Sequence, residues 1–194
     1  MPEFIKFIED FAKSLNLENF YILGHSLGGS ISLHYALEYP HRIKKLVVLS
    51  SFGLGKDIAL WIRILSSPFF IKLFGGVAVF TLKLVRSIGA LFHLPLKSIN
   101  PLPKVKIDIG RKITTFKGQN NILTNRLAEL AMPTLLIWGD KDGIVPSRHA
   151  YYAAQLIPEC KVKIFKNCGH VIQRQMVPEL IYTVTDFINR RNLE

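Results

Sequence analysis

Cysteine is scarce in this chain of 194 residues, which contains only Cys160 and Cys168. The two flank a short β-prone run, residues 161–165, and an extended strand rises by ~3.3 Å per residue. Its ends therefore lie farther apart than the ~7 Å between Cα atoms that a disulfide allows. We expect two reduced thiols in a cytoplasmic protein, and we exclude a disulfide-stabilised fold.

Acidic residues are also few, with 14 Asp and Glu against 25 Lys and Arg, so the formal net charge is +11. Residues 52–131 hold twelve of the basic residues and three of the acidic ones. The basic side chains stand singly among aliphatic residues, without the long runs or motifs typical of nucleic-acid-binding proteins. We therefore expect no nucleic-acid partner. Contact with a membrane surface through this basic, apolar segment stays open.

Long uninterrupted apolar runs are missing as well. The most apolar region, residues 58–96, is divided into charge-free runs of about ten residues or fewer, short of the ~20 that a spanning helix needs, by Arg63, Lys72, Lys83 and Arg86. The first residues lack the basic stretch and long apolar run of a signal peptide. The sequence therefore predicts neither a transmembrane span nor a secretory signal.

Short apolar runs alternate with helical patterns along the rest of the chain. The runs suited to strands are residues 20–23, 45–50, 134–138 and 162–165, and helical spacing marks residues 2–15, 27–39, 147–157 and 178–190. Continuous apolar runs are typical of parallel strands that are covered on both faces. We therefore predict an α/β fold with a parallel sheet of about four strands and helices on both faces.

Residues 52–130 break this alternation, because they are helical in composition, with Gly75-Gly76 and Pro95 as interruptions. We interpret them as a helical cap inserted into a core formed by residues 1–51 and 131–194. Its aromatic side chains are expected to pack the cap, and some of them to line an apolar pocket: Trp61, Phe69, Phe70, Phe74, Phe80 and Phe92.

The pentapeptide Gly24-His25-Ser26-Leu27-Gly28 stands between the first predicted strand and the helix that follows it. Flanking glycines permit a sharp strand-to-helix turn, the nucleophile elbow, which lifts the serine above the edge of the sheet. In that geometry Ser26 is a nucleophile and the backbone N–H of Leu27 is an oxyanion donor. The alternative is that Ser26 is an ordinary polar turn residue.

Acidic side chains and a histidine follow the later strands. Asp140 and Asp142 come just after the strand at residues 134–138, and His170 comes just after the strand at residues 162–165. Ligands gather at the carboxyl ends of strands in open parallel sheets. The chain order Ser, Asp, His is that of a catalytic triad on this kind of fold, with either aspartate as the acid. No cluster has metal-ligand spacing, and no cofactor is implied.

Together these motifs resemble the α/β-hydrolase superfamily, above all its cap-bearing esterases and carbon–carbon-bond hydrolases. The matching stretches are residues 24–29, residues 138–146, and Gly169-His170 followed by Pro178-Glu179. The resemblance implies that Asp142 is the triad acid, while Asp140 caps the turn after its strand. We also expect His25, Trp61 and Val145 to contact the substrate.

Members of that superfamily carry further strands before the nucleophile strand, and one of their loops supplies a second oxyanion N–H. The resemblance therefore implies an N-terminally truncated fold whose nucleophile strand is an exposed sheet edge, open to self-association. The leading hypothesis is a serine hydrolase that cleaves a hydrophobic carboxylic ester or related carbonyl compound through an acyl-enzyme. The alternatives are a catalytically impaired fragment that acts as a binding module, and a lipid esterase at a membrane surface.

Overall fold

The computed structural model describes residues 1–65, 67, 114–115 and 117–190. They belong to two compact units, one formed by residues 1–57 and 121–194 and the other by residues 58–120. Residues 52–57 and 121–130, which the sequence analysis assigned to the cap, thus lie in the first unit. That residues 58–120 act as a cap stays a prediction.

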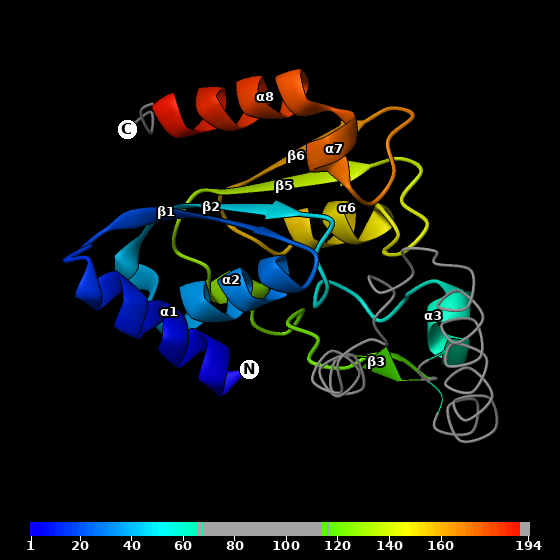
Figure 1. The fold of residues 1–194 in the computed structure, drawn as a ribbon, viewed down its shortest axis with the longest axis horizontal. Helices are drawn as coiled ribbons and strands as arrows, with labels where there is room; N and C mark the ends of the chain where they lie inside the picture. Colours follow the sequence, from blue (N-terminus) through cyan, green and yellow to red (C-terminus); the bar gives the residue numbers. More distant parts are fainter. Residues whose placement is uncertain (66, 68–113, 116, 191–194) are drawn as a thin grey trace, which may run out of the picture. The chain divides into compact units, whose positions relative to one another are not determined.

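The first unit is built on a four-stranded parallel sheet in the order β1-β2-β5-β6 (Figure 1). Its strands are β1 (Phe20–His25), β2 (Ile43–Leu49), β5 (Thr134–Gly139) and β6 (Cys160–Phe165). Each one contains or overlaps a strand that the sequence predicts. The α/β fold with a parallel sheet is therefore confirmed.

Helices cover both faces of this sheet, as predicted. In Figure 1, α1 (Pro2–Ser14), α2 (Leu27–Glu38) and α6 (Arg148–Ala154) lie on one face, and α8 (Val177–Asn189) lies on the other. Shorter helical segments complete the unit: η1 (Pro40–Arg42), η3 (Leu127–Glu129) and α7 (Ile172–Gln175). No helix in the described part of the chain is both long enough and apolar enough to cross a membrane.

The described part of the second unit is small. It contains α3 (Leu60–Leu65) and an antiparallel pair of two-residue strands, β3 (Thr114–Thr115) and β4 (Gly118–Gln119).

Two buried clusters hold the first unit together, one on each face of the sheet. Leu46 and Val48 of β2 belong to the cluster under α1, α2 and α6, whereas Val47 and Leu49 belong to the cluster that includes Phe187 of α8. Side chains alternate between the two faces of a strand, so β2 is buried on both sides. Its continuous apolar run is thereby explained.

The β1 strand forms one edge of the sheet. Phe20 and Ile22 pack against the cluster under α1 and α2, whereas Tyr21 and Leu23 are 47% and 50% exposed. The strand residues of the cluster that includes Phe187 of α8 come from β2, β5 and β6, and none of them comes from β1. Within the described residues, the strand that leads to Ser26 thus has one half-exposed face. Self-association through this edge stays a prediction.

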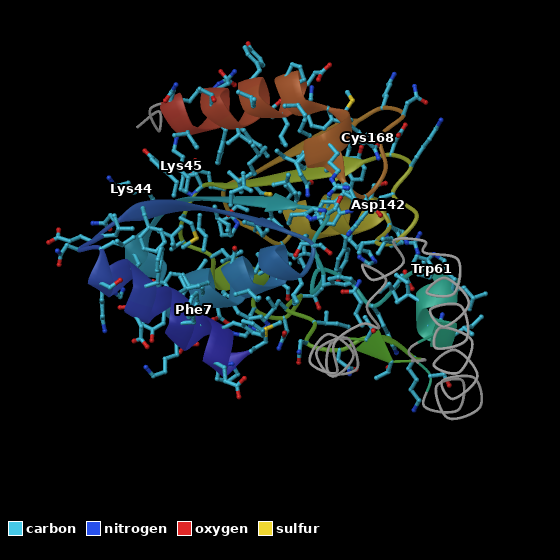
Figure 2. All side chains as sticks on the ribbon, viewed as in Figure 1. Phe7, Lys44, Lys45, Trp61, Asp142 and Cys168 are labelled. Carbon is cyan, nitrogen blue, oxygen red and sulfur yellow. The ribbon has the colours of Figure 1, made fainter. Side chains whose placement is uncertain are left out.

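A buried lysine on β2 holds the C-terminal end of α8. Lys45 Nζ donates hydrogen bonds of 2.5–3.2 Å to the backbone carbonyls of Phe187, Ile188 and Arg190. The last carbonyl groups of a helix receive no hydrogen bond from within the helix, and they carry partial negative charge. A cation beside them is therefore stabilising. Figure 2 labels Lys45 beside its exposed neighbour Lys44.

A buried carboxylate links α1 to α2 and η1. Glu9 accepts hydrogen bonds from the Tyr35 hydroxyl at 2.6 Å and from Arg42 Nε at 3.3 Å, and it pairs with Lys13 at 3.3 Å. The Tyr35 hydrogen bond is the main cause that lowers the pKa of Glu9, against the opposing effect of burial. Burial and this same hydrogen bond raise the pKa of Tyr35 to about 12.

Replacing Lys45 by methionine tests the contact between β2 and α8. Lys45→Met keeps an apolar stem but leaves three carbonyls without their charged donor, so we expect the free energy of unfolding to fall by about 2 kcal/mol. Urea denaturation measures the change. Lys44→Met, on the same strand but exposed, is the control and should change stability by less than about 0.5 kcal/mol. Equal losses in the two variants would contradict this role.

The stability of the chain should depend on pH through Glu9. Its folded-state pKa is lowered, so its contribution is fully present above the unfolded value of ~4.3 and disappears as the pH falls through the folded-state pKa. We expect Glu9→Gln to lower the unfolding temperature at pH 7, and its difference from the wild type to shrink as the pH approaches 3. Asp10→Asn, an exposed change on the same helix, is the control. A difference that is constant from pH 7 to pH 3 would refute the assignment.

Candidate active site

Ser26 occupies a sharp turn between β1 and α2. Its backbone φ of 56° lies in the left-handed region, which residues other than glycine seldom adopt. The Ser26 N–H donates to the Leu49 carbonyl at 2.9 Å, and the Ser26 carbonyl accepts from the N–H groups of Ser30 and Phe52. Bonds to β2 and α2 thus stabilise a backbone conformation of the kind that clusters at functional sites.

Two close approaches of the backbone make this turn dependent on glycine. A Cβ atom on Gly24 would lie 2.3 Å from the Gly28 carbonyl oxygen, and one on Gly29 would lie 2.6 Å from Ser51 Oγ. A Cβ atom on Gly28 would meet nothing within 4 Å. Of the two glycines that flank the serine, only Gly24 is thus required by a close contact, and Gly29, which follows Gly28, is required by another.

His170 contacts both Ser26 and Asp142. Its Nε2 is 3.0 Å from Ser26 Oγ, and its Nδ1 is 2.9 Å from Asp142 Oδ2. An ionised carboxylate can only accept, so Nδ1 carries a proton, and in the neutral ring Nε2 accepts from the Ser26 hydroxyl. The three residues follow β1, β5 and β6, whose carboxyl ends lie at the same edge of the sheet.

The carboxylate of Asp142 is fully buried and well supplied with donors. Besides His170, the backbone N–H groups of Ile144 and Val145 donate to its Oδ1 at 2.9 and 3.0 Å. Burial alone would raise the pKa of Asp142, but the hydrogen bonds from His170 and the two N–H groups outweigh it and hold the pKa below its usual range. Asp142 is therefore a carboxylate at neutral pH.

Asp140, the other aspartate, contacts the backbone of the His170 loop. Its Oδ1 accepts from the Cys168 N–H at 3.2 Å, and the next residue, Lys141, donates its N–H to the Cys168 carbonyl at 2.9 Å. The structure thus distinguishes the roles of the two aspartates, because Asp142 and not Asp140 has a hydrogen bond to the imidazole of His170.

Both cysteines of the chain are free thiols, as the sequence predicts.

The structure also locates the other residues predicted for the site. Leu27 is the first residue of α2, so its N–H has no acceptor within the helix and can bind a ligand. Val145 is fully buried in the core, and it contributes to the site through the N–H that reaches Asp142 rather than through its side chain. Trp61 lies on α3 in the second unit. The predicted cap phenylalanines lie outside the described residues: Phe69, Phe70, Phe74, Phe80 and Phe92.

Two glutamines take part in hydrogen bonds around His170 that the sequence analysis missed. Gln175 Oε1 accepts from the Gly169 N–H at 2.7 Å, and Gln173 Nε2 lies 3.3 Å from His25 Nδ1. His25 in turn contacts the His170 backbone carbonyl. Glutamine belongs to no motif here, so only the folded positions of α7 and the loop before it reveal these contacts.

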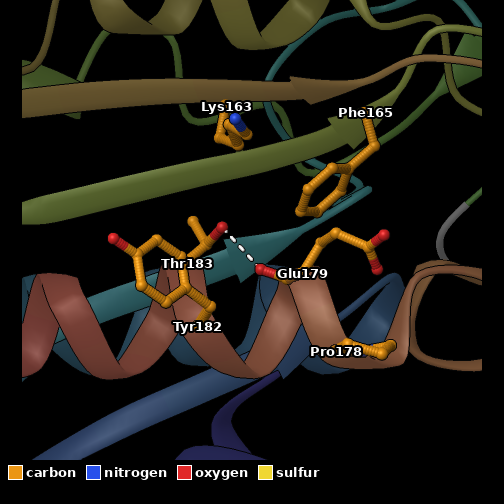
Figure 3. A pocket seen from close by; sticks show the side chains of 6 residues that line it. All are labelled: Lys163, Phe165, Pro178, Glu179, Tyr182 and Thr183. Carbon is orange, nitrogen blue, oxygen red and sulfur yellow. Dashed lines mark hydrogen bonds between the residues drawn. The ribbon is translucent and has the colours of Figure 1, made fainter.

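Two grooves on the first unit are lined entirely by described residues. An apolar groove of about 580 Å³ runs along α1 and β1 and reaches Gly24, His25 and Gly28. A second groove, of about 430 Å³, lies between β6 and α8 and contains none of Ser26, Asp142 and His170 (Figure 3). Of these two, the apolar groove is the one that adjoins the Ser26 turn.

Metal-ligating side chains do not cluster in the part of the chain that the structure describes. There, His, Cys, Asp and Glu form no group of three or more that could hold a metal ion. That the site needs no metal or cofactor stays a prediction.

Comparison with proteins of known sequence gives partial-length matches. An uncharacterized protein of Mycobacterium tuberculosis is 30% identical, over 84% of this chain and 54% of the relative. A 2-hydroxy-6-oxo-6-phenylhexa-2,4-dienoate hydrolase of Comamonas testosteroni is 25% identical, over 92% of this chain and 65% of the relative. The chain thus spans between half and two thirds of the length of these relatives.

Solved structures share the fold. A meta-cleavage product hydrolase of Pseudomonas fluorescens superposes with a TM-score of 0.64 at 21% identity, covering 97% of this chain and 71% of its own. A carboxylesterase of Bacillus subtilis superposes with a TM-score of 0.65 at 20% identity, covering 97% of this chain and 66% of its own. The family described as serine aminopeptidase, S33 matches residues 1–175. The chain therefore belongs to this family of the α/β-hydrolase superfamily.

Proposed function

We propose that this chain is the triad-bearing part of a serine hydrolase that cleaves an apolar carboxylic ester or a related carbonyl compound. In this proposal Ser26 is the nucleophile, His170 the general base and Asp142 the acid that orients His170. The observation that supports it is the continuous set of contacts from Ser26 Oγ through His170 to the buried Asp142, at 3.0 and 2.9 Å.

Acylation would begin when Ser26 Oγ attacks the substrate carbonyl. His170 Nε2 takes the hydroxyl proton, and the Asp142 carboxylate stabilises the imidazolium that forms. The negative charge on the carbonyl oxygen would be stabilised by the Leu27 N–H at the positive end of α2. When the tetrahedral intermediate collapses, the bond to the leaving group breaks and His170 returns the proton to it.

Deacylation would repeat these steps with water. His170 Nε2 takes a proton from a water molecule, whose oxygen attacks the ester carbonyl of the acyl-enzyme. The bond between the acyl carbon and Ser26 Oγ then breaks, and Oγ recovers its proton from His170. The products are the free acid and the original serine.

The proposed substrate class rests on the relatives and on the surface near Ser26. One relative is a 2-hydroxy-6-oxo-6-phenylhexa-2,4-dienoate hydrolase, and one structural neighbour is a carboxylesterase. The apolar groove that reaches His25 and Gly28 supports an apolar group on the substrate. A binding role without catalysis is the second candidate, favoured by the half-exposed Tyr21 and Leu23 of the edge strand β1.

Covalent labelling tests the nucleophile. A fluorophosphonate probe should label the wild-type chain and should not label Ser26→Ala, because only an activated serine reacts with it at an appreciable rate. Ser14→Ala, which removes an exposed serine at the end of α1, should label like the wild type. A folded wild-type chain that neither labels nor hydrolyses p-nitrophenyl esters would favour the binding role.

Paired asparagine substitutions test the roles of the two aspartates. Asp142→Asn should lower kcat for p-nitrophenyl ester hydrolysis by about 10⁴, because an amide no longer holds the required tautomer of His170. Asp140→Asn keeps an oxygen that can accept from the Cys168 N–H, so we expect a loss of about tenfold or less. If Asp140→Asn caused the greater loss, the assignment of the triad acid would be wrong.

A further inference from the structure

His25, the last residue of β1, contacts the catalytic histidine from a second direction. Its Nε2 lies 2.8 Å from the His170 backbone carbonyl oxygen, and its Nδ1 lies 3.3 Å from Gln173 Nε2. The two imidazole rings are 4.9 Å apart between centroids. Both ring nitrogens of His25 are therefore engaged by the protein itself, so neither is free to form a hydrogen bond with a substrate. That His25 contacts the substrate stays a prediction.

The two hydrogen bonds identify the form of His25. A carbonyl oxygen can only accept, so Nε2 carries the ring proton and donates a hydrogen bond to the His170 carbonyl oxygen. In the neutral ring Nδ1 then accepts from the side-chain amide of Gln173. Burial lowers the pKa of His25, which agrees with a neutral ring.

The sheet alone does not join the Ser26 turn to the His170 loop. These segments follow β1 and β6, the opposite edges of the four-stranded sheet, with β2 and β5 between them. Among the described residues, three hydrogen bonds connect the two segments. They join the Ser26 hydroxyl to His170, His25 to the His170 carbonyl, and Gln173 to His25.

These contacts would not all survive in an acyl-enzyme. Once Ser26 Oγ is esterified, it has no proton to donate, and its hydrogen bond to His170 Nε2 is lost. His170 must still hold its position, because it then takes a proton from water. Among the described residues, the hydrogen bonds that His170 itself then keeps are those with Asp142 at the ring and with His25 at the backbone carbonyl.

We infer that His25 is a positioning residue that fixes the His170 backbone and thereby supports hydrolysis of the acyl-enzyme more than its formation. The inference rests on the proposed function. It assigns to the residue before the nucleophile a role in the second half of the reaction.

Pre-steady-state kinetics with a p-nitrophenyl ester test the inference. His25→Phe keeps an aromatic ring but removes the donor, so we expect deacylation to slow by about tenfold, a fraction of the ~10²–10⁴ that a positioned general base supplies. Acylation should slow by less than about threefold, because the Ser26 hydrogen bond is still present in that step. The burst should consequently rise toward one molecule of p-nitrophenol per chain.

Two further variants serve as controls. His25→Gln, whose amide can donate to the His170 carbonyl, should restore part of the deacylation rate, and the exposed His41→Phe should change neither step.

Long-range ¹H–¹⁵N NMR of the resting chain gives a readout that needs no turnover. We expect His25 to be neutral with its proton on Nε2, and we expect His25→Phe, but not His41→Phe, to shift the ring signals of His170. A proton on His25 Nδ1, or equal slowing of acylation and deacylation, would overturn the inference. If fluorophosphonate fails to label wild-type Ser26, the proposed function fails, and the NMR result alone decides whether His25 holds His170.

Discussion

The site depends on the parallel pairing of β1, β2, β5 and β6. Parallel strands bring their carboxyl ends to one edge, so the residues that follow three of them, Ser26, Asp142 and His170, can meet although they are far apart in the chain. The central strands, β2 and β5, are buried on both faces, and this packing stabilises the end of the sheet at which the three residues meet. The Leu49 carbonyl at the end of β2 also binds the Ser26 N–H directly, which couples the sheet to the strained turn.

The two aspartates after β5 show how local contacts divide similar residues between different tasks. Asp142 is buried, accepts two backbone N–H groups and contacts the imidazole, so its charge is available to an imidazolium. Asp140 accepts the Cys168 N–H and so stabilises the loop that carries His170. One carboxylate thus acts on the ring of His170 and the other on the backbone before it. His25 adds a third constraint, at the His170 carbonyl.

Features that depend on local pattern could be predicted from the sequence, and features that depend on packing could not. Apolar runs of strand length predict the four strands. Ser26, Asp142 and His170, which meet at the carboxyl end of the sheet, come just after three of these runs. The close approach of Ser51 to Gly29 is a contact between distant segments, which pattern does not reveal. The burial of Val145 and the capping of α8 by Lys45 likewise depend on how distant elements pack.

The central claim is that Ser26, activated by His170 and Asp142, forms an acyl-enzyme. Mass spectrometry after a rapid acid quench of the chain with a p-nitrophenyl ester tests it most directly, because acid stops deacylation and preserves an ester on the protein. The account predicts a mass increase equal to the acyl group, located on the peptide that contains Ser26. Ester turnover without any such adduct, or an adduct on another residue, would contradict it.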